Sequence, residues 1–156
     1  MMRYLEGFDD SNHTASTEGT PNHVAWCLGH CALTMHRAAE RIDGRLELDG
    51  SFVVGERSGD ARRFGTESVS FGSDPRAGAV FPSFERCVAA FRGAVDRLAG
   101  ALSNCPESTL DEHAQFFGGV SLARWNVVPR SVFHNGFHCG QIADLRRVLK
   151  LRPVLG

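Results

Sequence analysis

The sequence predicts an all-α protein in which long helices pack together as a bundle. Two segments repeat apolar residues at alternating steps of four and three, which is the spacing of a helix that buries one face. A third segment, near the C-terminus, has the same pattern and carries two histidines in its apolar stripe. With 156 residues, the chain is expected to form one domain spanning 1–156 with a sizeable core.

The first long helix is expected to begin at Thr20-Pro21, because a capping residue is followed there by proline at the first helical position. Asp43-Gly44 is expected to end it. Residues 1–19 predict one or two helical turns followed by a polar linker, so a helix preceding this one would be short. The apolar stripe of the first long helix comprises Val24, Leu28, Cys31, Met35, Ala38 and Ile42.

The next long helix follows an irregular crossover over residues 44–82. Within this crossover, Leu46 to Val54 alternates in polarity and predicts a short strand pair. A crossover of this length allows the two helices that it joins to run parallel. Ser83 is expected to cap the second helix and Asn104-Cys105-Pro106 to end it. Its apolar stripe comprises Phe84, Val88, Phe91, Val95, Leu98 and Leu102.

The last helix is expected over residues 127–151, after a connector at 107–126 that contains a short helix around Leu110 to Phe117. Two histidines four residues apart lie on one face of a helix, so both imidazoles can reach one metal ion. Gly136 and Gly140 indicate close approach of another helix or room for a ligand, unless packing simply tolerates them. The apolar stripe begins at Phe133 or His134 and continues through His138, Ile142, Leu145 and Leu149.

Each residue of this candidate site also has a purely structural interpretation. His134 taken alone is better explained as a core histidine bonded to a carbonyl, and only its pairing with His138 favours a metal. His30, on the first long helix, is a third candidate ligand, and three imidazoles with an open fourth position are typical of catalytic metal sites. Gln141 either orients a metal-binding histidine or links two helices. Trp26 either walls the site or is a core aromatic residue.

The other histidines and the cysteines are expected to lie outside the metal site. His23 is predicted to be exposed in the first turn of its helix. Cys139 points away from the histidine pair around the helix, and Cys27 and Cys31 are expected to be buried as small apolar residues. The histidines predicted to lie on the surface or in loops are His13, His36 and His113.

Composition argues against several classes of function. The net charge is −1, and the local basic cluster from Arg146 to Arg152 falls in the last turns of a helix, where cations complement the dipole. We therefore expect no nucleic-acid partner. No apolar run reaches membrane-spanning length and the N-terminus shows no signal-peptide pattern, so no membrane partner is expected. Five cysteines without an export signal predict reduced thiols in a cytoplasmic protein.

Three motifs together resemble the DinB-like superfamily, which includes metal-dependent thiol transferases. Phe81-Pro82-Ser83, at the start of a long helix, is similar to the pattern that follows the family's crossover. The resemblance covers roughly residues 20–150 and implies a four-helix bundle of up-down-down-up type, with a long crossover after the second helix. The three motifs are Trp26-Cys27-Leu28-Gly29-His30, the His134/His138 pair and Gly140-Gln141-Ile142-Ala143-Asp144-Leu145-Arg146-Arg147.

The resemblance also implies a metal site and partners. A divalent metal ion, zinc or nickel, would be held by His30, His134 and His138, with Gln141 and Trp26 around it. Family members are commonly homodimers that use a low-molecular-weight thiol and an electrophile. The family begins with a full helix that residues 1–19 are too short to supply, so either this helix is truncated or a partner chain completes the bundle.

The chemistry expected at such a site follows from its charge. Three neutral imidazoles leave a metal ion strongly Lewis acidic, so that a bound thiol becomes the thiolate nucleophile or a bound water loses a proton. The expected function is therefore that of a metal-dependent S-transferase, with a hydrolase as the related alternative. Two other classes stay open: a non-catalytic metal-binding homodimer of stress-response type, and a metal-free ligand-binding or interaction module.

Overall fold

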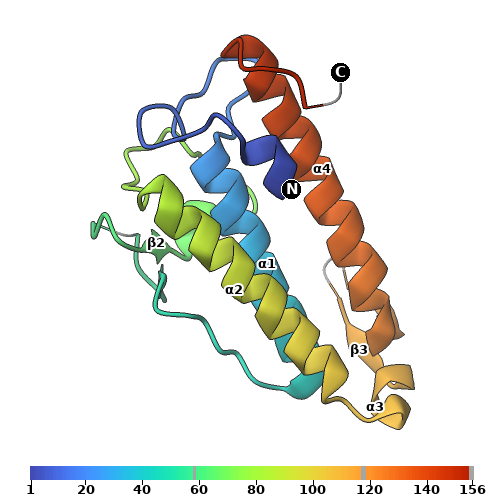
Figure 1. Ribbon diagram of the computed structural model, residues 1–156. Helices are drawn as coiled ribbons and strands as arrows, with labels where there is room; N and C mark the ends of the chain where they lie inside the picture. The colour runs from blue at the N-terminus through green and yellow to red at the C-terminus, as the bar shows by residue number, and fades with distance from the viewer. Residues whose placement is uncertain (58, 117–118, 155–156) are drawn as a thin grey trace.

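The computed structural model describes residues 1–57, 59–116 and 119–154, and this part of the chain is mostly helical (Figure 1). Its three long helices are α1 (Val24–Asp43), α2 (Phe84–Ser103) and α4 (Val127–Val148). Helices α1 and α2 run in the same direction, and α4 runs in the opposite direction beside them (Figure 1). None of the described helices is long and apolar enough to cross a membrane. The shorter elements are the 3₁₀ turns η1 (Met2–Leu5), η2 (Glu67–Val69) and η3 (Arg124–Asn126), the helix α3 (Glu107–Asp111), and the strands β1 (Phe52–Val53), β2 (Phe64–Gly65), β3 (His113–Gln115) and β4 (Ser121–Ala123).

The N-terminal region contributes one 3₁₀ turn, η1, and no long helix. The described residues therefore form three long helices and the five-residue α3, and the four long helices implied by the family resemblance are not all present among them. The buried Arg146 fixes the N-terminal segment to the end of α4, because its guanidinium donates hydrogen bonds to the carbonyls of Tyr4, at 3.0 Å, and Glu6. Arg146 thus has a packing role that its expected place beside the helix dipole did not indicate.

Two pairs of short strands accompany the helices, at positions that differ from the expected ones. A strand pair was expected within Leu46 to Val54, but only Phe52–Val53 forms a strand there and its partner lies beyond that range, because pairing depends on where the chain returns. Helix α3 ends at Asp111 and a strand follows it, so the helix expected around Leu110 to Phe117 is wrong beyond Asp111, while Phe117 itself lies outside the described residues. Parallel β1 and β2 pair Phe52 with Phe64 and Val53 with Gly65, and antiparallel β3 and β4 pair His113 with Ala123 and Gln115 with Ser121.

Helix α1 begins later than Thr20-Pro21 because the chain first makes a separate turn. Backbone groups of Thr17 and Thr20 bond each other in both directions at 3.2 Å. The N-cap is His23, whose Nδ1 accepts a hydrogen bond from the backbone N–H of Trp26 at 3.1 Å. His23 is buried against Phe81, with ring centroids 4.5 Å apart. The prediction of an exposed histidine in the first turn is therefore wrong.

The buried cap makes a testable contribution to acid stability. Burial lowers the pKa of His23 to about 4, against about 6.5 in an unfolded chain. The unfolded state therefore binds the proton more readily, and stability falls as the pH decreases from 6.5 towards 4, by up to about 3 kcal/mol for this group. We expect His23→Asn, which keeps a capping side chain, to show a shallower loss of stability over this range. Urea unfolding at several pH values measures both slopes, and equal slopes would contradict the assignment.

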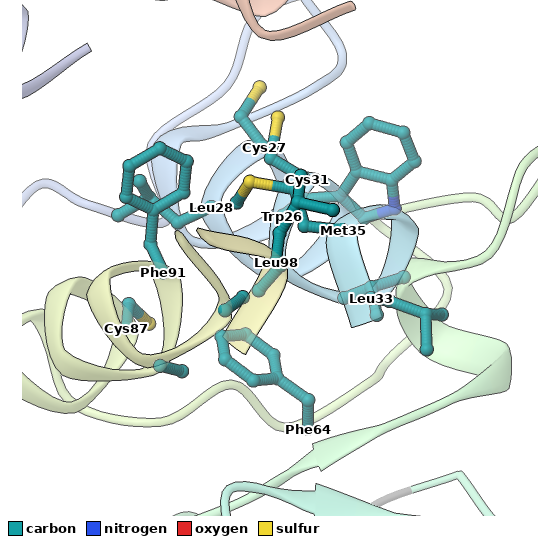
Figure 2. Packing of buried hydrophobic residues seen from close by; sticks show 14 of the residues in the cluster. Trp26, Cys27, Leu28, Cys31, Leu33, Met35, Phe64, Cys87, Phe91 and Leu98 are labelled. Carbon is teal, nitrogen blue, oxygen red and sulfur yellow. The ribbon is translucent and has the colours of Figure 1, made fainter. Parts of the chain in front are cut away.

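Helix α1 forms the centre of the core and packs against α2, α4 and η2 (Figure 1). All six residues of its expected apolar stripe are buried, and burial extends around the helix to Trp26, Cys27 and Leu33. Figure 2 shows Cys27 and Cys31 among these apolar side chains, as expected. Burial raises the pKa of the Cys27 thiol to about 12, so it stays protonated. Gly44, with a φ of 77°, ends the helix where the sequence predicted.

Helix α2 buries smaller side chains than its apolar stripe indicated, along a face that is rotated from that stripe. Val95 is 41% exposed, so its predicted place in the core is wrong. Cysteine and alanine residues occupy much of the buried face and allow α2 to lie close to α1. Figure 2 shows Cys87, Phe91 and Leu98 of α2 within the buried cluster. The Ser83 cap is confirmed, since its Oγ accepts from the backbone N–H of Arg86 at 3.3 Å. The buried residues of α2 are Cys87, Ala90, Phe91, Ala94, Leu98 and Ala101.

The crossover lays β2 and η2 directly onto α1. Phe64 and Val69 are fully buried, and both lie against Gly29 of α1. A Cβ atom at Gly29 would lie 2.6 Å from Phe64 Cε1 and 2.9 Å from Val69 Cγ1, so this approach requires a residue without a side chain. The close contact places the backbone carbonyl of Val69 beside His30.

Candidate metal centre

Three imidazoles from two distant segments converge between α1 and α4. His30 lies on α1, while His134 and His138 lie one turn apart on α4. Nε2 of His134 lies 3.1 Å from Nε2 of His30 and 3.3 Å from Nε2 of His138. Each ring offers one nitrogen to a common centre, and these nitrogens all lie within 4.8 Å of one another. The structure thus brings together the three residues that the sequence singled out.

Hydrogen bonds on the far side of two rings determine which nitrogen faces the centre. Nδ1 of His30 lies 2.7 Å from the carbonyl oxygen of Val69, and Nδ1 of His138 lies 2.8 Å from Oε1 of Gln141. Because both partners are acceptors, Nδ1 carries the hydrogen in each ring and Nε2 keeps a lone pair. An outer acceptor of this kind is usual for histidines that bind metal.

This donor set fits a cation better than it fits a cluster of three neutral rings. Nε2 of His134 faces the lone pairs of both His30 and His138, but it carries at most one hydrogen. It can donate that hydrogen to one neighbour, and its contact with the other then has no hydrogen between the two nitrogens. A divalent cation would accept all three lone pairs. Neutral imidazole suits zinc, nickel, copper and iron, so the residues present fit a transition metal ion.

Burial keeps the three imidazoles neutral near pH 7. Burial, followed by the neighbouring His138 and His30, lowers the pKa of His134 to about 4. Burial also lowers the pKa of His138 to about 4, although its hydrogen bond to Gln141 acts in the opposite direction. The pKa of His30 is lowered as well, chiefly by burial. Neutral rings retain the lone pairs that a metal ion requires.

Trp26 forms a wall of the histidine cluster. Its indole stacks on the ring of His30 with centroids 4.5 Å apart and an interplanar angle of 11°. Its Nε1 donates a hydrogen bond to Ser73 Oγ at 2.8 Å, which ties the indole to the crossover. Trp26 is thus a buried core aromatic residue that also limits the space around His30. Cys139 does not belong to the cluster.

The side-chain oxygen of Gln141 forms hydrogen bonds both within α4 and to the segment before α1. Its Oε1 accepts from Nδ1 of His138 and from Nδ2 of Asn22, the latter at 3.3 Å. Gln141 therefore orients a histidine and also links α4 to the segment that precedes α1. The link reaches a residue outside the helices, and a role for Gln141 beside a bound metal stays a prediction.

The orienting role of Gln141 predicts a measurable effect on metal affinity. Replacement by methionine keeps the length of the side chain but removes the acceptor for His138. Loss of such an outer partner costs about 10- to 100-fold in affinity, so we expect Gln141→Met to weaken Zn²⁺ binding by that factor without abolishing it. Titration against a chelator of known affinity measures the change. Gln115→Met, on exposed β3, is the matched control, and an equal loss there would rule out a specific role.

The remaining histidines lie outside the cluster, although two are more buried than expected. His36 is buried beside Phe52, with ring centroids 5.7 Å apart, and His13 is buried with Nε2 2.9 Å from the carbonyl oxygen of Pro82. The prediction of a surface or loop position is therefore wrong for His36, which lies within α1, whereas His13 lies in the turn before α1 as predicted but is buried. His113 is exposed, as expected.

A cavity of about 880 Å³ borders the cluster, with His30 and His134 in its wall. It lies among α1, the beginning of α4 and the connectors around Phe71 and Phe116. Among histidine, cysteine, aspartate and glutamate side chains in the described ranges, only the three histidines form a group that could hold an ion. No fourth ligand of these types therefore closes the cluster within the part of the chain that the structure describes.

The cavity also contains residues that sequence reasoning missed. Arg37 and Arg130 line it, yet neither was considered part of a site. A signal was available for both: Arg37 follows His30 by seven residues, and Arg130 precedes His134 by four, so each shares a helix face with a histidine. No such signal marks the carbonyl of Val69, because the crossover alone determines its position.

The chain belongs to the DinB superfamily, whose sequence model matches residues 1–142. This match confirms the resemblance carried by the residues around His30 and by the histidine pair of α4. No curated protein and no solved structure matches the chain. The specific activity must therefore be inferred from the site itself.

Proposed function

We propose that the protein is a metal-dependent enzyme that uses a low-molecular-weight thiol as co-substrate. One observation carries the proposal: three histidine nitrogens converge beside a large cavity, and no fourth ligand from the described histidine, cysteine or acidic residues closes the group. Three imidazoles with an open position are typical of catalytic metal sites. Zinc or nickel is the proposed ion.

The residues around the cluster hold and orient it. His30, His134 and His138 would bind the ion, while Val69 and Gln141 keep two of the rings in the required tautomer. When bound, the ion would supply Lewis acidity that favours the deprotonated form of a thiol or of water. The stacked indole of Trp26 limits the space on one side of His30, which leaves the cavity as the approach for co-substrates.

The competing functions make different demands on the site. A purely structural metal centre favours a fourth protein ligand and needs no cleft, whereas the described residues supply a cavity. A metal-free module would leave His134 between two acceptor nitrogens with one hydrogen to share. The cavity thus favours an enzyme over a structural metal centre, and the contacts of His134 favour a metal site over a metal-free module. A hydrolase would use the same cluster and differs only in the nucleophile.

Turnover with a generic electrophile tests the proposal. Metal-loaded protein is mixed with a panel of small thiols and 1-chloro-2,4-dinitrobenzene. The thiolate sulfur displaces chloride from the ring, and the coloured thioether is followed by absorbance. We expect consumption that depends on both thiol and metal and is lost in His134→Ala. Release of nitrophenol from a nitrophenyl ester without thiol would assign the hydrolase instead, and inactivity in both assays would contradict the proposal.

We further propose that two copies pair through α4. Its outer face exposes the apolar side chains of Val132 (68%), Phe133 (77%) and Phe137 (58%). Gly136 lies on the same face, and a Cβ atom there would meet no described atom within 4 Å. Contiguous exposed apolar surface of this kind marks interfaces, and small residues allow two helices to approach.

Sedimentation tests this pairing. We expect the protein to be a dimer and Gly136→Arg to be a monomer that unfolds at about the same temperature. Gly100→Arg on α2, where a Cβ atom also meets nothing within 4 Å, is the matched control and should remain dimeric. A monomeric parent protein would contradict the proposal.

A further inference from the structure

The cavity beside the histidines presents one continuous face of α1. Its lining residues on this helix begin at His30 and continue at steps of three and four through Leu33 to Arg37 and Arg41. Such spacing places them along one side of the helix. Arg37 therefore lies two turns, or about 10 Å along the axis, from His30. The cavity thus has a metal-binding region and, along α1, a cationic region.

Helix α4 supplies a cation on the same side of the histidine cluster. Arg130 precedes His134 by four residues, which is one turn or about 6 Å along the axis. Because α4 runs opposite to α1, the beginning of α4 lies beside the end of α1 (Figure 1). Both Arg37 and Arg130 therefore lie displaced from the histidines towards the same end of the molecule.

Among the described residues, no nearby carboxylate balances the charge of Arg37 or Arg130. None of the described residues that line the cavity is aspartate or glutamate. Within the described ranges, no carboxylate lies close enough to Arg37 or Arg130 to form an ion pair. Arg41 donates a hydrogen bond to the carbonyl of Gln115. The guanidinium carbons of Arg41 and Arg130 lie 5.9 and 5.8 Å from the centroid of the Phe116 ring. An anion would relieve the repulsion among these guanidinium groups.

Most of the remaining cavity wall is apolar, although it includes Thr34, Ser70, Asn126 and Ser131. Leu33 and Phe116 lie within it, and Phe71 at its edge is 94% exposed. A bare inorganic anion would leave this surface in contact with water. A ligand with an apolar body would cover it, and burial of that body contributes to binding.

We infer that the cavity binds an apolar small molecule that carries an oxyanion group, either a carboxylate or a phosphate ester. Arg37 and Arg130 bind the oxyanion, because the planar guanidinium matches both groups. The apolar body then extends towards His30 and His134. The inference rests on the proposed function in one respect, since it names the chemical class of one of the two co-substrates.

Binding to the metal-free protein tests this inference independently of turnover. The probes for calorimetry are 4-phenylbutyrate, 3-phenylpropyl phosphate, the neutral 4-phenylbutyramide and inorganic phosphate. We expect the two anionic aromatic probes to bind at least about tenfold more tightly than the amide or inorganic phosphate. The tighter of the two identifies the preferred oxyanion. Equal binding of the amide, or of inorganic phosphate, would overturn the inference.

Variants assign the selectivity to the two arginines. We expect Arg37→Met and Arg130→Met each to weaken the better anionic probe by about tenfold and to leave the amide unchanged. Arg92→Met, on the exposed side of α2, is the matched control and should bind like the parent protein. If Arg37→Met and Arg130→Met both retain full selectivity, the inference fails.

The two proposals can fail separately. If thiol transfer is absent, the selectivity of the metal-free protein for anionic probes is unaffected. If the selectivity is absent, metal-dependent turnover of an uncharged electrophile remains measurable. Thermal unfolding of each arginine variant distinguishes a lost contact from a lost fold.

Discussion

Replacing His134 by alanine is expected to lower the affinity for Zn²⁺ or Ni²⁺ by at least about a hundredfold while the protein stays folded. Loss of an outer hydrogen-bond partner already costs about 10- to 100-fold, and His134 would be a direct ligand. Its Nε2 makes both short contacts within the cluster, at 3.1 and 3.3 Å. Elemental analysis and competition against a chelator measure the effect, with His113→Ala on exposed β3 as the control.

A second expectation concerns the thermal stability of this variant without metal, which should change little although metal affinity falls. In the parent protein, Nε2 of His134 faces two acceptor nitrogens with at most one hydrogen. Removing the ring removes that strained contact, so metal-free His134→Ala should not unfold at a much lower temperature than metal-free parent protein. The parent should gain about 4 kcal/mol when free metal exceeds the dissociation constant a thousandfold, and the variant should gain much less at that concentration. Equal stabilisation of both by metal would contradict the assignment.

The sequence predicted the long helices well because their apolar residues recur with helical spacing. The stripe of α4 left Phe133 and His134 as alternatives, and the structure resolves them: Phe133 is exposed, while His134 lies beside the other two histidines. In α2 the same reasoning placed Val95 in the core, where small side chains that carry little hydrophobic signal form much of the contact. Periodicity thus identified helices more reliably than it identified faces.

The candidate site was only partly predictable because α1 is buried on nearly every side. An amphipathic stripe cannot show which way His30 points when most residues around it are also buried. His23 and His36 were placed at the surface because they are polar, but they are buried with the rest of this region. The acceptor for His30 comes from Val69 in the irregular crossover, and no local pattern there indicated that contact.

A methyl group at Gly29 is expected to disturb both the fold and the site. The added Cβ of Gly29→Ala would lie 2.6 and 2.8 Å from two atoms of Phe64 and 2.9 Å from Val69 Cγ1, and both neighbours are fully buried. Overpacking of this kind costs about 1–3 kcal/mol, which outweighs a gain of up to about 1 kcal/mol in helix propensity. The contacts below 3 Å place the cost in the upper half of that range, so we expect a net loss of about 1–2 kcal/mol in urea unfolding.

The same substitution should weaken metal binding, because Val69 is also the acceptor for His30. Displacing η2 from α1 would lengthen the 2.7 Å contact between Nδ1 of His30 and the Val69 carbonyl, and a further loss of about 10-fold or more in Zn²⁺ affinity follows. Gly100→Ala is the matched control, because its Cβ would meet nothing within 4 Å and helix propensity should stabilise it by up to about 1 kcal/mol. If Gly29→Ala instead stabilised the protein as Gly100→Ala does, the crossover could not be packed on α1 as described, and the orientation of His30 would lose its structural basis.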